Sequence, residues 1–130
     1  MAYHLSATKE RNILWVRLTG ARTREAVWTA SREIVEACER EGTPKVLLDV
    51  REFEGRLASL DDYELPAKRF PELRGIVRAV AIVDTPENLD RFALFVDVAQ
   101  SLGFNLRAFG DINRATKWLK RTTSTARSLS

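Results

Sequence analysis

The amino-acid sequence predicts a small α/β domain in which a mixed sheet of about five strands packs against four helices. Short runs of β-branched and aliphatic residues alternate with longer runs of helical spacing, and capping residues, glycines or prolines separate them. In chain order these segments give β-β-α-β-α-β-α-β-α. A helix that joins two strands of one sheet almost always makes a right-handed crossover to a parallel strand, so we expect the later strands to be mostly parallel.

The first two strands are expected to form a hairpin. Apolar and polar side chains alternate over residues 3–7 and again over residues 13–19, as in half-buried strands. The polar residues 9–12 between them have the composition of a turn. In the second strand, Ile13 and Trp15 alternate with a face of leucine and valine, so they point to the opposite side of the sheet.

A long helix and a central strand follow the hairpin. Apolar residues recur at helical spacing over residues 23–41, where Thr23 or Thr19 can serve as N-cap and Gly42 ends the helix. Residues 45–50, KVLLDV, form a nearly continuous aliphatic run. Such a run is typical of a strand that is buried on both faces.

A polar loop over residues 51–58 leads to the second helix. Ser59 precedes acidic residues that suit the positive end of a helix dipole, so we expect Ser59 to cap a helix that ends near Pro71. Residues 77–83 then give a second buried strand.

The third helix should begin at Thr85, an N-cap followed by a proline in the first helical position, and should continue to Leu102. Residues 105–109 form the last short strand. Asp111 can cap a final helix that ends at Lys120.

A single domain over residues 1–121 with a polar, disordered tail at 122–130 accounts for the whole chain. The 130 residues are 45% hydrophobic and 30% charged, which are globular proportions. One cysteine, Cys38, and one histidine, His4, are too few for a disulfide or a structural zinc site, and we expect core and surface roles for them respectively. No apolar run is long enough for a bilayer or a secretory signal, so the predicted location is cytoplasmic.

The positive charge is concentrated at the C-terminal end. Residues 112–130 contain five basic and no acidic residues, whereas residues 1–111 carry slightly more acidic than basic residues. A nucleic-acid-binding domain carries its basic residues over the folded body, so we expect no nucleic-acid partner.

The sequence contains no phosphate-binding loop, dinucleotide fingerprint or nucleophile elbow, so we expect no catalytic residue and no cofactor. The remaining enzymatic hypothesis is a Mg²⁺ site for phosphotransfer or hydrolysis. Asp49, Asp84 and Asp111 each lie at or just past the C-terminal end of a predicted strand, at the edge where open α/β sheets bind ligands. Asp84 and Asp111 can instead cap the helices after them, and we favour this interpretation, without a metal.

Two surfaces are candidates for protein docking. One is the segment before and at the start of the second helix, where arginines next to a helix N-terminus suit an anion or a phosphoserine although the nearby acids would repel phosphate. Its residues are Arg51, Arg56, Ala58, Ser59, Asp61 and Asp62. The other surface is an uncovered sheet face that carries Ile13, Trp15 and Arg17.

Two apolar patterns suggest further sites. The third helix has a wide apolar arc that either packs in the core or lines a groove for an apolar ligand. The groove residues would be Leu89, Phe92, Phe95 and Val96. The final helix is basic and amphipathic, so it either packs on the sheet, which we favour, or contacts an anionic membrane. The membrane-contacting residues would be Lys117, Trp118, Lys120 and Arg121.

The order of these motifs resembles the SpoIIAA-like branch of the STAS domains. The similarity covers about residues 3–120 and rests on ILWVRLTG, KVLLDVREFEG, the Asp61-Asp62-Tyr63 helix start, RAVAIVD and LGFNLRAFGDINRATKWL. It implies a mixed sheet with helices chiefly on one face and no catalysis, since classical members are anti-sigma-factor antagonists that bind a kinase partner. The branch is also similar to CRAL-TRIO (SEC14-like) lipid carriers, which implies an apolar ligand or membrane contact.

In classical members a DSSG motif begins the second helix, and its first serine is phosphorylated. Aligned from Asp49, this motif falls on Leu57, Ala58, Ser59 and Leu60, so only Ser59 matches. Ala58 stands at the phosphorylated position, and the resemblance therefore does not carry the phosphoswitch over to this chain.

We accordingly predict a non-catalytic module that acts by association with a protein partner and that also forms a homodimer. The alternative is a carrier or sensor of a small apolar or lipidic ligand, held beneath the third helix, with peripheral membrane contact. The Mg²⁺-dependent enzyme ranks last.

Overall fold

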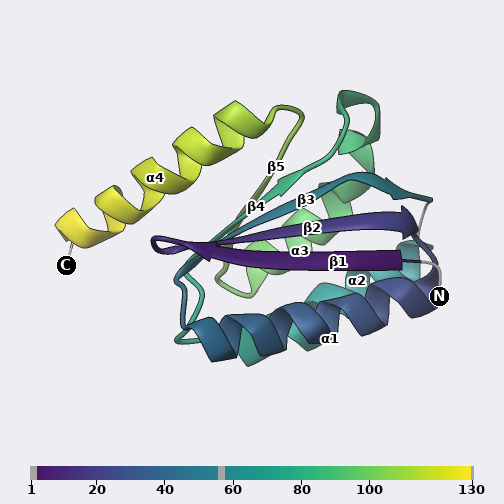
Figure 1. The fold of residues 1–130 in the computed structure, drawn as a ribbon, viewed down its shortest axis with the longest axis horizontal. Helices are drawn as coiled ribbons and strands as arrows, with labels where there is room; N and C mark the ends of the chain where they lie inside the picture. Colours follow the sequence, from purple (N-terminus) through teal and green to yellow (C-terminus); the bar gives the residue numbers. More distant parts are fainter. Residues whose placement is uncertain (1–2, 56–57, 130) are drawn as a thin grey trace.

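The protein is seen in a computed structural model that describes residues 3–55 and 58–129. The strands are β1 (Tyr3–Glu10), β2 (Ile13–Ala21), β3 (Lys45–Glu54), β4 (Ala79–Val83) and β5 (Asn105–Phe109). They form one five-stranded sheet in the order β1-β2-β3-β4-β5 (Figure 1). β1 pairs antiparallel with β2, and the later pairs are parallel. The predicted α/β class with a mixed sheet is confirmed.

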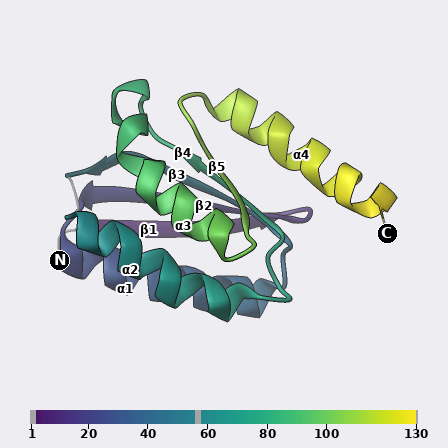
Figure 2. The same ribbon diagram turned by 180° about the vertical axis from the view of Figure 1, so that it is seen from behind.

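The helices cover both faces of the sheet unequally. They are α1 (Arg24–Glu41), α2 (Ser59–Arg69), α3 (Ala93–Ser101) and α4 (Ile112–Leu129), with the short 3₁₀ helices η1 (Phe70–Leu73) and η2 (Pro86–Phe92). Figures 1 and 2 show α1, α2 and α3 on one face and α4 on the other. Val46 and Val50 of β3 belong to the core beneath α1–α3, and Leu47 belongs to the core beneath α4. The central strand is therefore buried on both faces, as its aliphatic run predicts.

Three of the predicted helix-capping residues are present. The Thr23 side chain accepts a hydrogen bond from the backbone N–H of Ala26 at 3.1 Å, which satisfies a donor at the start of α1. Gly42 ends that helix with φ of 66°, in the left-handed region that glycine adopts without strain. At the start of α4, Asp111 Oδ1 accepts from the N–H of Asn113 at 3.4 Å.

The ends of β3 and α2 differ from the prediction. β3 continues through the polar residues 51–54 because Phe53 is buried against the core while its neighbours face outward. The expected N-cap at Ser59 is wrong: Ser59 is the first helical residue, and Ala58 occupies the cap without a side-chain bond. The backbone carbonyl of Ala58 accepts from Asp61 and Asp62, so the first turn closes one residue earlier than expected.

The third predicted helix is divided between η2 and α3. Thr85 does not cap it with its side chain. Asp84 Oδ1 instead accepts from the N–H of Thr85 at 2.7 Å and from Asn88 Nδ2 at 3.3 Å, which holds the first turn in the tighter 3₁₀ form. α4 continues to Leu129 rather than ending at Lys120, where the apolar spacing that predicted it stops.

α4 covers the sheet face on which a docking surface was considered. Ile13 is buried, and Trp15 packs against the same cluster as Trp118 and Leu119. Ile13 and Trp15 therefore do not form an exposed face, although Arg17 is exposed and paired with Glu52.

The packing of α4 also changes the interpretation of its basic residues. Trp118 is only 8% exposed, and its ring lies 5.6 Å from that of Phe109. The favoured prediction that this helix packs on the sheet is confirmed, and Trp118 does not face outward for a membrane. Lys117, Lys120 and Arg121 lie on the exposed side. Within residues 3–55 and 58–129 there is no helix with the length and hydropathy to cross a membrane.

Candidate functional site

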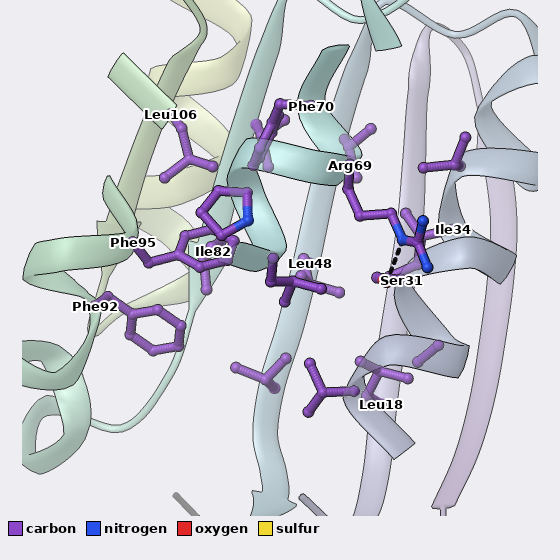
Figure 3. Close-up of a pocket in the computed structure, with 18 of the residues that line it drawn as sticks. Leu18, Ser31, Ile34, Leu48, Arg69, Phe70, Ile82, Phe92, Phe95 and Leu106 are labelled. Carbon is purple, nitrogen blue, oxygen red and sulfur yellow. Dashed lines mark hydrogen bonds between the residues drawn. The ribbon is translucent and has the colours of Figure 1, made fainter. Parts of the chain in front are cut away.

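A cavity of about 140 Å³ lies between the sheet and the helices α1, α2 and α3. Figure 3 shows Phe92 and Phe95 on one side of it and Ile34 on the opposite side, with Leu48 and Ile82 of the sheet between them. The lining is predominantly aliphatic and aromatic. A mainly apolar cavity with a few polar groups is the usual form of a small-molecule site.

Phe92 and Phe95 were predicted to line a ligand groove, and both line this cavity. Their rings meet edge to face with centroids 6.2 Å apart, and Phe95 meets Phe70 in the same way at 5.9 Å. Leu89 and Val96, the other two predicted residues, are not among the lining residues. The prediction assumed one continuous helix, whereas the change from η2 to α3 at Phe92 alters which residues share a face.

Arg69 closes the cavity on the side of α1. Its Nε donates to Ser31 Oγ at 2.8 Å, the bond drawn in Figure 3, and its guanidinium also reaches the carbonyl of Trp28 and the carboxylate of Glu72. These bonds fasten the end of α2 to α1. Arg69 is thus a structural residue of the cavity wall with its donors already engaged.

Arg22, which the sequence did not single out, lines the cavity with a side chain that is only 8% exposed. Its Nη2 donates to Asp84 Oδ2 at 3.2 Å and to the carbonyl of Val50 at 3.1 Å. The guanidinium lies 5.4 Å from the ring centre of Phe53 and 5.9 Å from that of Phe92. Within the described part of the chain, Arg22 Nε is buried and has no hydrogen-bond acceptor.

The three strand-end aspartates are engaged separately. Asp84 is fully buried against Arg22, Asp111 caps α4, and Asp49 accepts from Arg51 at 2.9 and 2.8 Å. Burial raises the pKa of Asp49, but the hydrogen bonds and charge of Arg51 outweigh this and leave it below its ordinary value. No group of three His, Cys, Asp or Glu side chains that suits a metal is found among the described residues.

The start of α2 is fixed to α1 by a buried carboxylate. Asp61 is 5% exposed, and its Oδ1 accepts from Arg24 Nε at 2.8 Å and from Trp28 Nε1 at 3.3 Å. It was expected in an exposed docking loop and instead anchors the helix. Arg56, another residue of that expected loop, and Leu57 lie outside the described residues.

Two large apolar side chains near the start of α2 face outward. Leu60 is 64% exposed and Tyr63 is 54% exposed. Tyr63 borders a surface groove between α1 and α2 that Arg24, Trp28 and Lys68 also line. Helical spacing of three residues places Leu60 and Tyr63 on one face, a pattern present in the sequence that the sequence-based prediction did not single out.

The single histidine and the single cysteine have ordinary positions. His4 is exposed on the edge strand β1, as expected. Cys38 is fully buried in the core, and burial raises its pKa to about 11. The predicted packing role of Cys38 is confirmed.

A comparison with protein-family models matches residues 13–120 to the SpoIIAA-like model. A search of curated proteins found no match. Among solved structures, an anti-sigma factor antagonist from Mycobacterium paratuberculosis is similar with a TM-score of 0.61 and 14% identity over 92% of this chain and 95% of that one. The anti-sigma factor antagonist SpoIIAA in its unphosphorylated form gives a TM-score of 0.57 and 15% identity over 89% of this chain and 95% of that one.

A third solved structure is an uncharacterized DUF3478-family protein with a SpoIIAA-like fold from Shewanella loihica PV-4. It gives a TM-score of 0.56 and 24% identity over 91% of this chain and 93% of that one. At these identities the three structures establish a shared fold.

Proposed function

Because the chain belongs to the SpoIIAA-like family, we propose that it is a non-catalytic regulatory module that acts by binding another protein through the start of α2. The observation that carries this proposal is the exposed pair Leu60 and Tyr63, at 64% and 54% exposure. Large apolar and aromatic side chains that remain in solvent mark protein interaction surfaces.

The surroundings of this pair suit a docking surface. Asp61 fastens the first turn of α2 to α1 through hydrogen bonds from Arg24 and Trp28, so the backbone that carries Leu60 and Tyr63 is held in place. A rigid aromatic anchor loses little conformational entropy when a partner covers it. The neighbouring groove adds charged residues at its rim, among them Glu64 and Lys68.

Binding by this surface would not be switched as in the classical members of the family. Ala58, which stands at their phosphorylated position, is the N-cap of α2 and has no hydroxyl to accept a phosphate. We therefore expect the association to be controlled by partner availability or by a ligand.

Affinity capture from cell extract tests the proposal. The double variant Leu60→Lys with Tyr63→Lys should lose the protein captured by wild type, because two charges replace the apolar anchor. Leu94→Lys is the matched control, since Leu94 is also exposed, at 40%, but lies on α3. Identical captured proteins for wild type, double variant and control would reject this surface.

A second candidate function is a carrier or sensor of a small apolar ligand, which the 140 Å³ cavity favours. Benzene titration followed by methyl NMR tests it. Bound benzene should shift the methyl signals of Leu48, Ile82 and Leu106, which line the cavity, and leave those of Leu47 and Leu119 on the α4 face unchanged. Unmoved signals at the lining residues would remove this function.

Self-association stays a prediction. Size-exclusion chromatography with light scattering measures it directly, and the mass of a monomer at all concentrations would contradict it.

A further inference from the structure

We propose that the cavity takes uncharged ligands, with a ring or short chain of about six to eight carbons and one carbonyl acceptor, and that Arg22 recognises that acceptor through Nε–H. The inference rests on the carrier function proposed above and adds the chemical class of the ligand.

The first step concerns which N–H groups of Arg22 already make hydrogen bonds. A guanidinium has five N–H donors, and here Nη2 serves both Asp84 and the carbonyl of Val50. Nε is buried with no acceptor in the described part of the chain. An unsatisfied donor in an apolar environment is costly, so an acceptor at this position would be strongly favoured.

The second step is the location of this donor. Arg22 lines the cavity, and its guanidinium lies near the rings of Phe53 and Phe92, which line the same cavity. Arg22 therefore belongs to the cavity wall, and an acceptor that bonds Nε must take the place of the atoms that cover it. The other polar groups differ: Arg69 is engaged by Ser31 and Glu72.

The third step is charge. Asp84, at 0% exposure, already balances the positive charge of Arg22 in a dry environment. A carboxylate ligand would bring a second negative charge next to Asp84, where the low dielectric makes repulsion strong. A carbonyl oxygen satisfies Nε–H without adding a charge.

The fourth step is size. The cavity volume of about 140 Å³ is close to that of an engineered cavity of about 150 Å³ that binds benzene. One six-membered ring with a small carbonyl substituent fills such a space, whereas a long acyl chain does not fit without movement of the helices.

Three probes of nearly equal shape test the hydrogen bond and the ligand charge separately. They are acetophenone, benzoate and α-methylstyrene, the last of which has a CH₂ group in place of the carbonyl oxygen. Affinities are measured by NMR titration of the wild-type protein, together with the Arg22 Nε–H signal. Acetophenone should bind about tenfold to a hundredfold more tightly than α-methylstyrene, the value of one hydrogen bond to a charged donor. It should shift the Nε–H signal further downfield, and benzoate should bind more weakly than acetophenone.

Two variants test whether Arg22 is the residue that binds the carbonyl oxygen of the ligand. Arg22→Met combined with Asp84→Asn removes both charges together, so that neither is left unpaired, and should bind acetophenone and α-methylstyrene equally. Arg91→Met is the matched control, because Arg91 also lines the cavity but donates to the carbonyl of Gly55 at 3.4 Å. This control should keep the preference for acetophenone.

The outcomes distinguish the inference from the function on which it rests. Equal wild-type affinity for acetophenone and α-methylstyrene overturns the role of Arg22 but leaves the carrier function intact. Benzoate as the tightest ligand, with loss of binding in Arg91→Met, overturns it in favour of an anion site on Arg91. Failure of all three probes to bind overturns the carrier function, and the inference with it.

Discussion

Replacing Arg22 by Met should be among the most damaging single substitutions in this protein. Asp84 is fully buried and has Arg22 as its cationic partner, so the variant leaves a carboxylate in the interior with only the neutral donors of Thr85 and Asn88. Loss of one partner of a buried ion pair costs about 3–5 kcal/mol. For a chain of this length that corresponds to a fall in Tm of about 10–20 °C.

A double variant removes both charges of the buried ion pair. Arg22→Met with Asp84→Asn should cost only about 1–2 kcal/mol, because no uncompensated charge remains. Urea denaturation followed by tryptophan fluorescence measures Arg22→Met, Asp84→Asn and the double variant. The cost of the double variant minus the sum of the two single costs gives the coupling between the two side chains.

An exposed pair provides the comparison. Arg17 and Glu52 have side chains 54% and 62% exposed, so Arg17→Met should cost less than about 1 kcal/mol. If Arg22→Met were no more damaging than Arg17→Met, or if the double variant cost the sum of its two single changes, the assignment of a tightly coupled buried pair would be refuted.

Three further predictions follow from single side chains. The hydrogen bonds and charge of Arg51 hold the pKa of Asp49 below its ordinary value, so the ion pair contributes fully to stability above the unfolded pKa of about 4. This contribution is lost as the pH falls through the lower folded pKa. The difference in unfolding free energy between wild type and Asp49→Asn, measured by urea denaturation, should therefore shrink below about pH 4, and a constant difference would contradict the pairing. Thr23→Ala should cost about 1 kcal/mol in thermal unfolding because it removes the cap of α1, and an unchanged Tm would contradict that role. Cys38, with a pKa of about 11, should react with a thiol reagent in native buffer far more slowly than in urea, and equal rates would mean that it is accessible.

The order of the elements could be predicted because it depends on local spacing. The aliphatic run of β3, the cap at Thr23 and the stop at Gly42 are each encoded within a few neighbouring residues, and the structure contains all three. The polar residues after Val50 have the composition of a loop, and only their pairing with β2 reveals that they continue the strand.

The contents of the site could not be predicted in the same way. Arg22 and Asp84 are separated by 62 positions, and neither belongs to a motif that points to the other. The two phenylalanines of the cavity were visible as an apolar arc, but whether that arc faces a filled core or a cavity depends on how three helices meet the sheet. The cover that α4 gives Ile13 and Trp15 is likewise a property of the tertiary arrangement.

The cavity beneath α1, α2 and α3 has a consequence for the response of the protein to pressure. Water occupies such space when the chain unfolds, so the unfolded state has the smaller total volume, by some tens of mL/mol. Hydrostatic compression should therefore unfold the protein, and a molecule that occupies the space should raise the midpoint pressure by more than its effect on thermal stability alone would suggest.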